Sequence, residues 1–126
     1  MKVIIAGSRT INSYEEVCKA VALSTFDITE VVSGGANGVD KLGEEWARNR
    51  GVPIKQFIPN WNLGKRAGFD RNEQMAAYAD ALIAVHDGQS RGTAHMIMAA
   101  KKCGLEVYLH EYMPPPVPAY RAPRGL

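Results

Sequence analysis

The sequence is poor in cysteine. Only Cys18 and Cys103 occur among its 126 residues. They lie far apart, and neither has a second Cys or a His at metal-ligand spacing, so the sequence predicts neither a disulfide framework nor a metal site. Both fall in helical patterns, where we expect reduced and buried thiols.

Long apolar runs and an excess of one charge are also lacking. The apolar run at residues 3–6 is too short for a signal sequence or a membrane span, and no other stretch is long enough, so we expect a cytoplasmic protein with no membrane partner. The 15 basic and 13 acidic residues give a net charge of +2. This balance argues against nucleic acid as a partner, although Lys65, Arg66 and the C-terminal arginines leave that class open.

The remaining composition is that of one globular α/β domain. Hydrophobic residues make up 46% of the chain, enough to bury a core at this length. Apolar runs predict strands at residues 3–6, 30–33, 53–58, 81–85 and 106–110, and helical periodicity predicts helices at about 14–24, 39–50, 70–78 and 93–102. This strict alternation predicts a parallel sheet covered by helices on both faces.

The composition changes after Tyr112. Proline becomes frequent from Met113 onward, so we expect a domain at residues 1–112 and a Pro-rich, extended or disordered tail at residues 113–126. A peptide-ligand role is the alternative for this tail.

Glycines, hydroxyls and arginines gather where the predicted strands end. Ligands of a doubly wound sheet bind beyond the carboxyl ends of its strands. There the sequence places Gly7, Ser8 and Arg9 after the first strand and the segment 33–40 after the second. That segment lacks the Gly-Lys-Ser/Thr of a Walker A loop and the spacing of a dinucleotide fingerprint. Its three glycines still predict uncovered backbone N–H groups facing an anion at a helix N-terminus.

Two later segments, residues 64–72 and 87–93, extend this pattern. In the second, glycines and hydroxyls again follow a strand and precede a helix, and Arg9, Arg71 and Arg91 are the expected phosphate partners. Arg71 and Asn72 open the predicted third helix, where a cation opposes the helix dipole and so suggests either an anionic ligand or an ion pair with Asp70 or Glu73. Trp61, upstream, can stack on a base or merely cover the loop. The candidate ligand-binding residues are Gly7, Ser8, Arg9, Ser33, Gly34, Gly35, Ala36, Gly38, Asp40, Arg71, Asn72, Asp87, Gly88, Ser90, Arg91, Gly92 and Thr93.

These motifs, taken in order, resemble the YspA-like branch of the SLOG superfamily, which is more distantly similar to the Lonely Guy phosphoribohydrolases and to DprA. The resemblance covers residues 1 to about 110. It implies a Rossmann-like three-layer sandwich with a mostly parallel sheet of five strands or slightly more. It also implies a nucleotide or nucleotide-derived ligand such as an ADP-ribose derivative. Pockets completed by a neighbouring subunit occur among SLOG proteins, which makes a homo-oligomer an expectation here.

The resemblance to Lonely Guy enzymes is incomplete. Arg71 matches their catalytic arginine, and Gly92 and Thr93 match part of their phosphate loop, but Met96 stands where they carry a catalytic glutamate. A thioether can neither stabilise an oxocarbenium-like centre nor activate water. The remaining candidates for a catalytic role are Arg71, Glu73 and His95, with Asp40 as a further carboxylate.

Three functions therefore compete at the level of sequence. The first is a domain that senses or sequesters a nucleotide-like molecule, with no other cofactor. The second is an N-glycosidase acting on nucleoside monophosphates. The third is nucleic-acid binding of the DprA type.

Overall fold

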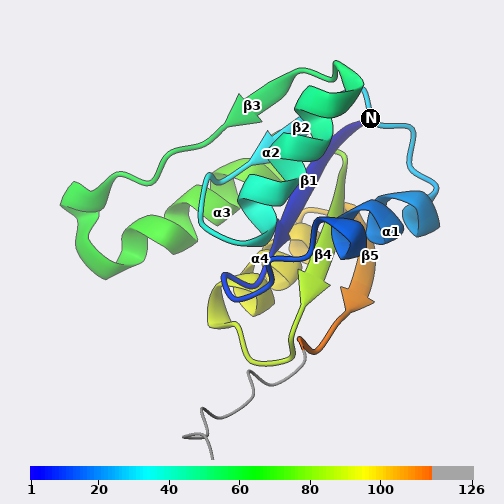
Figure 1. The fold of residues 1–126 in the computed structure, drawn as a ribbon. Helices are drawn as coiled ribbons and strands as arrows, with labels where there is room; N and C mark the ends of the chain where they lie inside the picture. The colour runs from blue at the N-terminus through cyan, green and yellow to red at the C-terminus, as the bar shows by residue number, and fades with distance from the viewer. Residues whose placement is uncertain (115–126) are drawn as a thin grey trace, which may run out of the picture.

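The computed structural model describes residues 1–114. Its strands are β1 (Lys2–Gly7), β2 (Glu30–Ser33), β3 (Ile54–Gln56), β4 (Ala81–His86) and β5 (Glu106–Glu111). Its α-helices are α1 (Tyr14–Ser24), α2 (Val39–Arg50), α3 (Ala67–Tyr78) and α4 (Arg91–Lys102), and Figure 1 labels these strands and helices. A 3-10 helix (Trp61–Arg66) directly precedes α3. The predicted alternation of strand and helix is confirmed. The predicted tail beyond residue 114 lies outside the described residues.

The five strands form one sheet in the order β3-β2-β1-β4-β5. Every pair in it is parallel. Each crossover therefore needs a helix to carry the chain back to the starting edge of the sheet. The strand order runs outward from β1 in both directions, which is the doubly wound arrangement. The expectation of a Rossmann-like α/β fold is confirmed.

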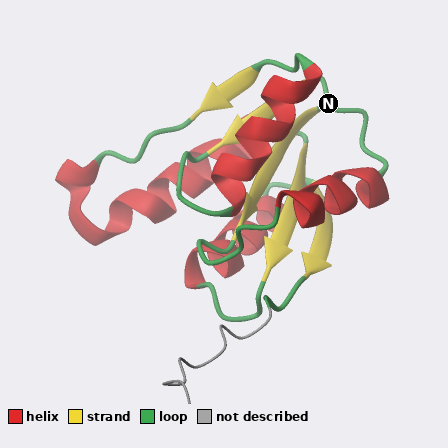
Figure 2. Ribbon diagram, viewed as in Figure 1, coloured by secondary structure: helices red, strands yellow, loops and turns green. Residues whose placement is uncertain are grey.

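Helices cover both faces of the sheet, as Figure 2 shows. Alternate residues of β1 supply the two cores. Val3 and Ile5 pack with α1 and α2, while Ile4 and Ala6 pack with α3 and α4. Because side chains alternate across a strand, a central parallel strand buried on both faces must be apolar throughout.

Three elements differ from their predicted bounds by more than one residue at one end. β3 covers only Ile54–Gln56, half of the expected range, because it pairs with β2 alone over that length. α3 begins at Ala67, directly after the 3-10 helix Trp61–Arg66, where a loop was expected. α4 begins at Arg91 because Ser90 caps it, accepting a hydrogen bond from Thr93 N.

The two cysteines differ from expectation. Cys18 is half-buried, but Cys103 is exposed because it lies at the last turn of α4, where the chain leaves the helix. The prediction of a buried Cys103 is wrong. Among the described residues, no helix has both the length and the apolar character needed to cross a membrane.

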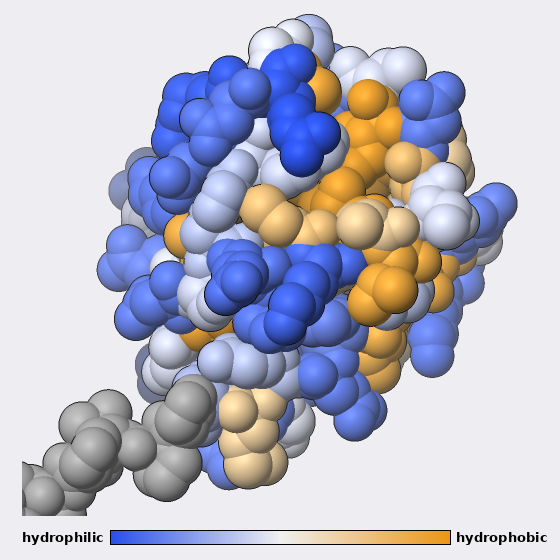
Figure 3. All heavy atoms as spheres, turned by 45° about the vertical axis from the view of Figure 1, so that its right-hand side comes forward, coloured by the Kyte–Doolittle hydropathy of each residue, from blue (hydrophilic) through white to orange (hydrophobic). Residues whose placement is uncertain are grey.

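The surface is mostly hydrophilic but carries scattered apolar side chains. Figure 3 shows one face on which hydrophilic residues predominate and hydrophobic residues gather toward its right side. Leu23 of α1 and Leu109 of β5 are among the exposed hydrophobic residues. A second exposed group, Ile58, Trp61 and Leu63, follows β3 and lies close to the candidate site.

Candidate functional site

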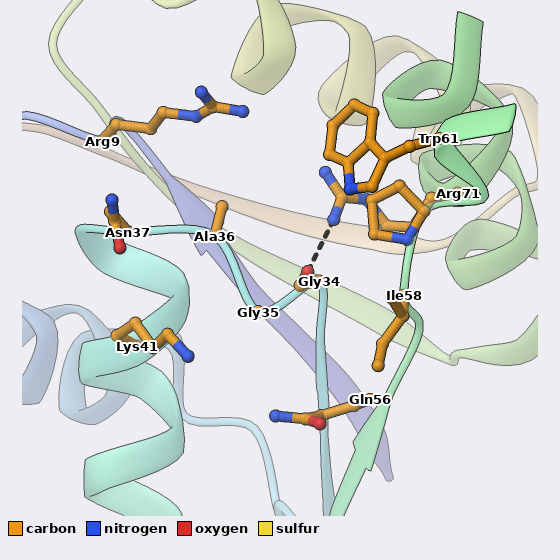
Figure 4. A pocket seen from close by; sticks show the side chains of 11 residues that line it. Arg9, Gly34, Gly35, Ala36, Asn37, Lys41, Gln56, Ile58, Trp61 and Arg71 are labelled. Atoms are coloured by element: carbon orange, nitrogen blue, oxygen red, sulfur yellow. Dashed lines mark hydrogen bonds between the residues drawn. The ribbon is translucent and has the colours of Figure 1, made fainter. Parts of the chain in front are cut away.

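Two adjoining cavities lie at the carboxyl ends of the strands. The larger encloses about 380 Å³ and the smaller about 140 Å³, and they share Arg9, Ala36 and Arg71. In Figure 4, Arg9 and Lys41 reach toward the larger cavity from one side, and Trp61 and Arg71 from the other. The segments that the sequence marked after the first, second and fourth strands therefore meet at one place.

Arg71 lies at the centre of this site and lines both cavities. Its side chain is buried, with the residue only 9% exposed, and Nη1 donates to the carbonyl oxygen of Gly34 at 2.6 Å while Nε donates to Asn72 Oδ1 at 3.2 Å. A buried guanidinium keeps its charge, and its field is weakly screened. Desolvation lowers the pKa of Arg71 from its usual value, and the nearby carboxylate of Asp40 opposes that shift.

Of the two explanations offered for Arg71 from sequence, the ion pair with Asp70 or Glu73 is wrong, whereas the anionic ligand stays a prediction and loses only the helix-dipole argument behind it. Because α3 begins at Ala67, Arg71 lies beyond the first turn and does not oppose the helix dipole there. Within the described part of the chain it forms no ion pair with Asp70 or Glu73, and its hydrogen bonds go to Gly34 and Asn72 instead. The long side chain reaches across to the loop after β2, which sequence spacing does not reveal.

The glycine-rich loop presents fewer free donors than its sequence predicts. Gly35 N donates to Ser33 Oγ at 3.1 Å, and Ala36 N donates to Asp40 Oδ2 at 3.2 Å. These two N–H groups are thus bonded within the loop, so an anion in the larger cavity must rely chiefly on side-chain cations. The glycines are required for a different reason: a Cβ on Gly34 would lie 2.6 Å from Arg71 Nη1 and 2.9 Å from Asp40 Oδ2.

Asp40 places a buried carboxylate in the smaller cavity. The residue is 5% exposed, and the carboxylate accepts the N–H of Ala36. Burial is the largest influence and raises the pKa of Asp40 from 3.8 to about 6, against the lowering effects of the Ala36 N–H and of Arg71. Near neutral pH the carboxylate of Asp40 is ionised although it is buried, and this lowers the free energy of unfolding of the protein.

This destabilisation predicts a pH dependence of stability. Because the native pKa of Asp40 exceeds its unfolded value, the folded protein binds more protons between pH 4 and 6, and its stability falls as the pH rises through that window. The shift corresponds to about 3 kcal/mol. Asp40→Asn keeps an oxygen that can accept the Ala36 N–H and removes the titration.

Urea denaturation of both proteins from pH 4 to pH 7.5 measures the effect. We expect the difference between their free energies of unfolding to change by about 3 kcal/mol in favour of the variant as the pH rises. A difference that stays constant with pH would contradict the burial argument for Asp40.

Other predicted residues brace the loops rather than line the cavities. Ser8 Oγ accepts from Asp87 N at 3.0 Å, and Thr10 Oγ1 donates to Asp87 Oδ2 at 3.2 Å. Asp87 also accepts the N–H groups of Gln89 and Ser90. Ser33 donates to the buried carboxylate of Glu44 at 2.7 Å.

The cavities divide the predicted residues into four sets, of which Arg9, Ala36 and Arg71, shared by both cavities, are one. Gly34 and Gly35 line only the larger cavity. The smaller cavity, besides the shared residues, is lined by Gly7, Asp40, Asn72, Ser90, Gly92 and Thr93. Neither cavity is lined by Ser8, Ser33, Gly38, Asp87, Gly88 or Arg91.

The candidate catalytic residues do not all converge. Glu73 and His95 line a different cavity, between the outer sides of α3 and α4. His95 stacks on Phe69 with ring centroids 4.2 Å apart, and its Nδ1 lies 3.3 Å from Asn72 Nδ2. Met96 is buried and lines the smaller cavity. Of the three catalytic candidates, only Arg71 reaches the site.

Several lining residues were not selected from the sequence. The larger cavity also includes Asn37, Lys41, Gln56, Ile58 and Pro59. Trp61, which the sequence offered as a residue that stacks on a base, lines the same cavity. Gln56 ends β3 and the segment 58–61 follows it, so the rule that sites gather at strand ends could have identified them. Nothing in the sequence marks Lys41 as a site residue, because a lysine in the first turn of an amphipathic helix is typical of a solvated surface.

Comparison with known proteins agrees with this architecture. The model of the YspA, cpYpsA-related SLOG family (YAcAr) matches residues 1–64. The chain belongs to this family. The matched part carries the β1 and β2 loops of the site, whereas Arg71 and the loop before α4 lie beyond it.

A similar phage protein extends the likeness to most of the chain. The Gene 61 protein of Mycobacterium phage D29 is 35% identical over 117 residues, which cover 84% of this chain and 93% of the phage protein. No solved structure matches the chain. Family membership is consistent with binding of a nucleotide-related molecule and does not specify which one.

Proposed function

We propose that the protein binds a nucleotide or a nucleotide-derived, ADP-ribose-like ligand and acts as a sensor or sequestering protein for it. The larger cavity carries the proposal, because three cationic side chains, Arg9, Lys41 and Arg71, line it. Among the described residues, none that lines it carries a carboxylate. Its volume of about 380 Å³ falls within the roughly 300–1,000 Å³ usual for small-molecule sites.

The two sides of the cavity suit the two parts of a nucleotide. Arg9 and Lys41 on one side, with Arg71 facing them from the other, suit a phosphate group, since guanidinium forks and ammonium groups bind phosphate oxygens strongly. On the other side Ile58, Pro59 and Trp61 form an apolar wall. Trp61 is 64% exposed, so its indole face is available to a base, and such stacking contributes about 1–3 kcal/mol.

The absence of a glutamate at Met96 favours binding over catalysis. In the described part of the chain, Asp40 is the sole carboxylate lining either cavity, and an oxocarbenium-like centre needs an anionic partner close by. A site rich in cations and poor in acids holds an anion without turning it over. This is why sensing or sequestration is our leading proposal.

Thermal unfolding with a ligand panel tests the proposal. We expect ADP or ADP-ribose at about 100 times its Kd to raise the Tm by roughly 10 °C, and adenosine, which lacks phosphate, to have little effect. A panel of nucleotides and ADP-ribose derivatives that leaves the Tm unchanged at millimolar concentration would refute nucleotide binding.

Trp61→Ala tests the base-stacking wall. We expect it to weaken ADP binding about 10-fold by removing the stacked ring, while pyrophosphate, which has no base, binds as before. Leu63→Ala is the matched control, because Leu63 is exposed on the same 3-10 helix and lines neither cavity. Equal losses for ADP and pyrophosphate would contradict the assignment of Trp61. Isothermal titration calorimetry measures both.

One observation supports the N-glycosidase as a second candidate. The carboxylate of Asp40 shares the smaller cavity with Arg71 and Thr93, so a charged acceptor is present although Met96 replaces the glutamate. Its pKa of about 6 would suit proton transfer near neutral pH. Incubation with nucleoside monophosphates and detection of free base decides the matter, and activity that survives both Asp40→Asn and Arg71→Met would refute this assignment.

A further inference from the structure

The smaller cavity has the size of a single ring rather than of a nucleotide. Its volume of about 140 Å³ is below the roughly 300–1,000 Å³ of complete small-molecule sites. It opens beside the larger cavity, with which it shares Arg9, Ala36 and Arg71. A ligand whose phosphates lie on these shared arginines can therefore extend one further group into it.

The polar groups of the smaller cavity suit a neutral group with several hydroxyls. Asp40 supplies carboxylate oxygens and is the main acceptor offered to a ligand. The hydroxyls of Ser90 and Thr93 are hydrogen-bonded to each other at 2.9 Å. The amide of Asn72 accepts from Arg71 Nε and donates to the carbonyl oxygen of Gly92, so these groups add a polar rim around the carboxylate. Ala6, Met75 and Met96 provide an apolar floor. Vicinal hydroxyls of a sugar donate to a carboxylate while the carbon skeleton rests on apolar surface, so this combination matches a sugar ring.

A second phosphate group fits this cavity poorly. The carboxylate of Asp40 would repel it at short range in a buried setting. Donors that could offset this repulsion are partly committed: Thr93 N donates to Ser90 Oγ, and Arg71 uses Nη1 and Nε on Gly34 and Asn72. The larger cavity, by contrast, has three cations and no lining carboxylate among the described residues.

We propose that Asp40 is a specificity-determining residue, which accepts hydrogen bonds from the hydroxyls of a sugar attached to the ligand's diphosphate. The protein then selects nucleotides with a second sugar beyond the diphosphate over those that end there. This inference rests on the proposed function, because it needs the diphosphate to lie on Arg9 and Arg71. It adds the orientation of the ligand and the residue that recognises its far end.

The test compares two ligands of equal charge. ADP-ribose and the β-ethyl ester of ADP both carry a diphosphate diester, and only the first has a second sugar. We expect calorimetry at pH 7.5 to show ADP-ribose binding at least 10-fold more tightly to the wild type. Asp40→Asn should abolish that preference, because it replaces a charged acceptor by a weaker one, while the ethyl ester binds within about 3-fold of wild type.

A matched variant separates this role from a general effect on the site. Lys41 lines only the larger cavity, so Lys41→Met should weaken both ligands by the same factor and preserve the preference. Asp40→Asn retains an acceptor for the Ala36 N–H, so a purely bracing role for Asp40 predicts no change in the preference. Loss of affinity for both ligands to the same extent in Asp40→Asn would overturn the inference.

A measurement on the wild type alone guards against a variant that fails to fold. Three charged groups face Asp40: Glu44 from α2, Arg71 from α3 and Arg9 from the loop after β1. Neither ligand titrates between pH 5 and 7.5, so the preference for ADP-ribose should fall as Asp40 takes up a proton near pH 6. A preference independent of pH, or equal binding of both ligands, overturns the inference alone; failure of both to bind overturns the proposed function with it.

Discussion

Gly38→Ala is expected to lower the free energy of unfolding by about 4 kcal/mol or more, because backbone strain and steric overlap add at this position. Gly38 has φ +79° and ψ −130°, a region that only glycine adopts readily. A Cβ there would lie 2.4 Å from the carbonyl oxygen of Ser8 and 2.7 Å from Arg9 Cα. These are backbone atoms of the β1–α1 loop, so relieving the overlap means moving that loop away from α2 and opening the site.

Gly64→Ala is the matched control for this prediction. Gly64 has φ +70° and ψ −143°, nearly the same backbone conformation, and a Cβ there would meet no atom within 4 Å. We expect this variant to cost only the backbone strain, about 1–3 kcal/mol. Urea denaturation of both variants then isolates the overlap, and equal destabilisation would show that the contact with the Ser8–Arg9 backbone contributes nothing.

Arg71→Met is expected to weaken binding of a nucleotide diphosphate by about 100- to 1,000-fold, or about 3–4 kcal/mol. Methionine retains much of the apolar stem but removes the guanidinium, which borders both cavities. Because this cation is buried, solvent screens it far less than a surface arginine. The substitution also leaves the carbonyl oxygen of Gly34 without the donor seen at 2.6 Å.

Arg91→Met provides the comparison for Arg71. Arg91 was an equally plausible phosphate partner in the sequence, yet it is exposed and lines neither cavity. We expect its substitution to change the Kd by less than about 3-fold. Calorimetry on both variants, after circular dichroism has shown that they are folded, measures the contrast. Similar losses in the two variants would mean that long-range charge, and not the buried position of Arg71, governs binding.

Local sequence patterns predicted the bounds of an element well where residues at its own ends mark where it begins and stops. The helix Val39–Arg50 was predicted to the residue, because a glycine precedes it and Gly51 ends it in the left-handed conformation. The start of α3 was missed because its first residues continue a 3-10 turn from Trp61–Arg66, with no capping side chain to mark the boundary. Because α3 begins three residues earlier than predicted, Arg71 lies beyond the first turn of the helix and does not oppose the helix dipole.

The strand and helix order, the parallel sheet and the edge at which the loops gather could all be predicted from the amino-acid sequence. Those features follow from apolar periodicity and from the helical crossovers that parallel strands require. Which polar groups are free for a ligand became evident from the folded structure alone. Ser33 and Asp40 take up the N–H groups of Gly35 and Ala36, and Glu73 and His95 face another cavity. The two hydrogen bonds join residues at most four positions apart, but they form only in the folded conformation of the loop. The position of Glu73 and His95 depends on how α3 packs against α4. Spacing along the chain encodes neither.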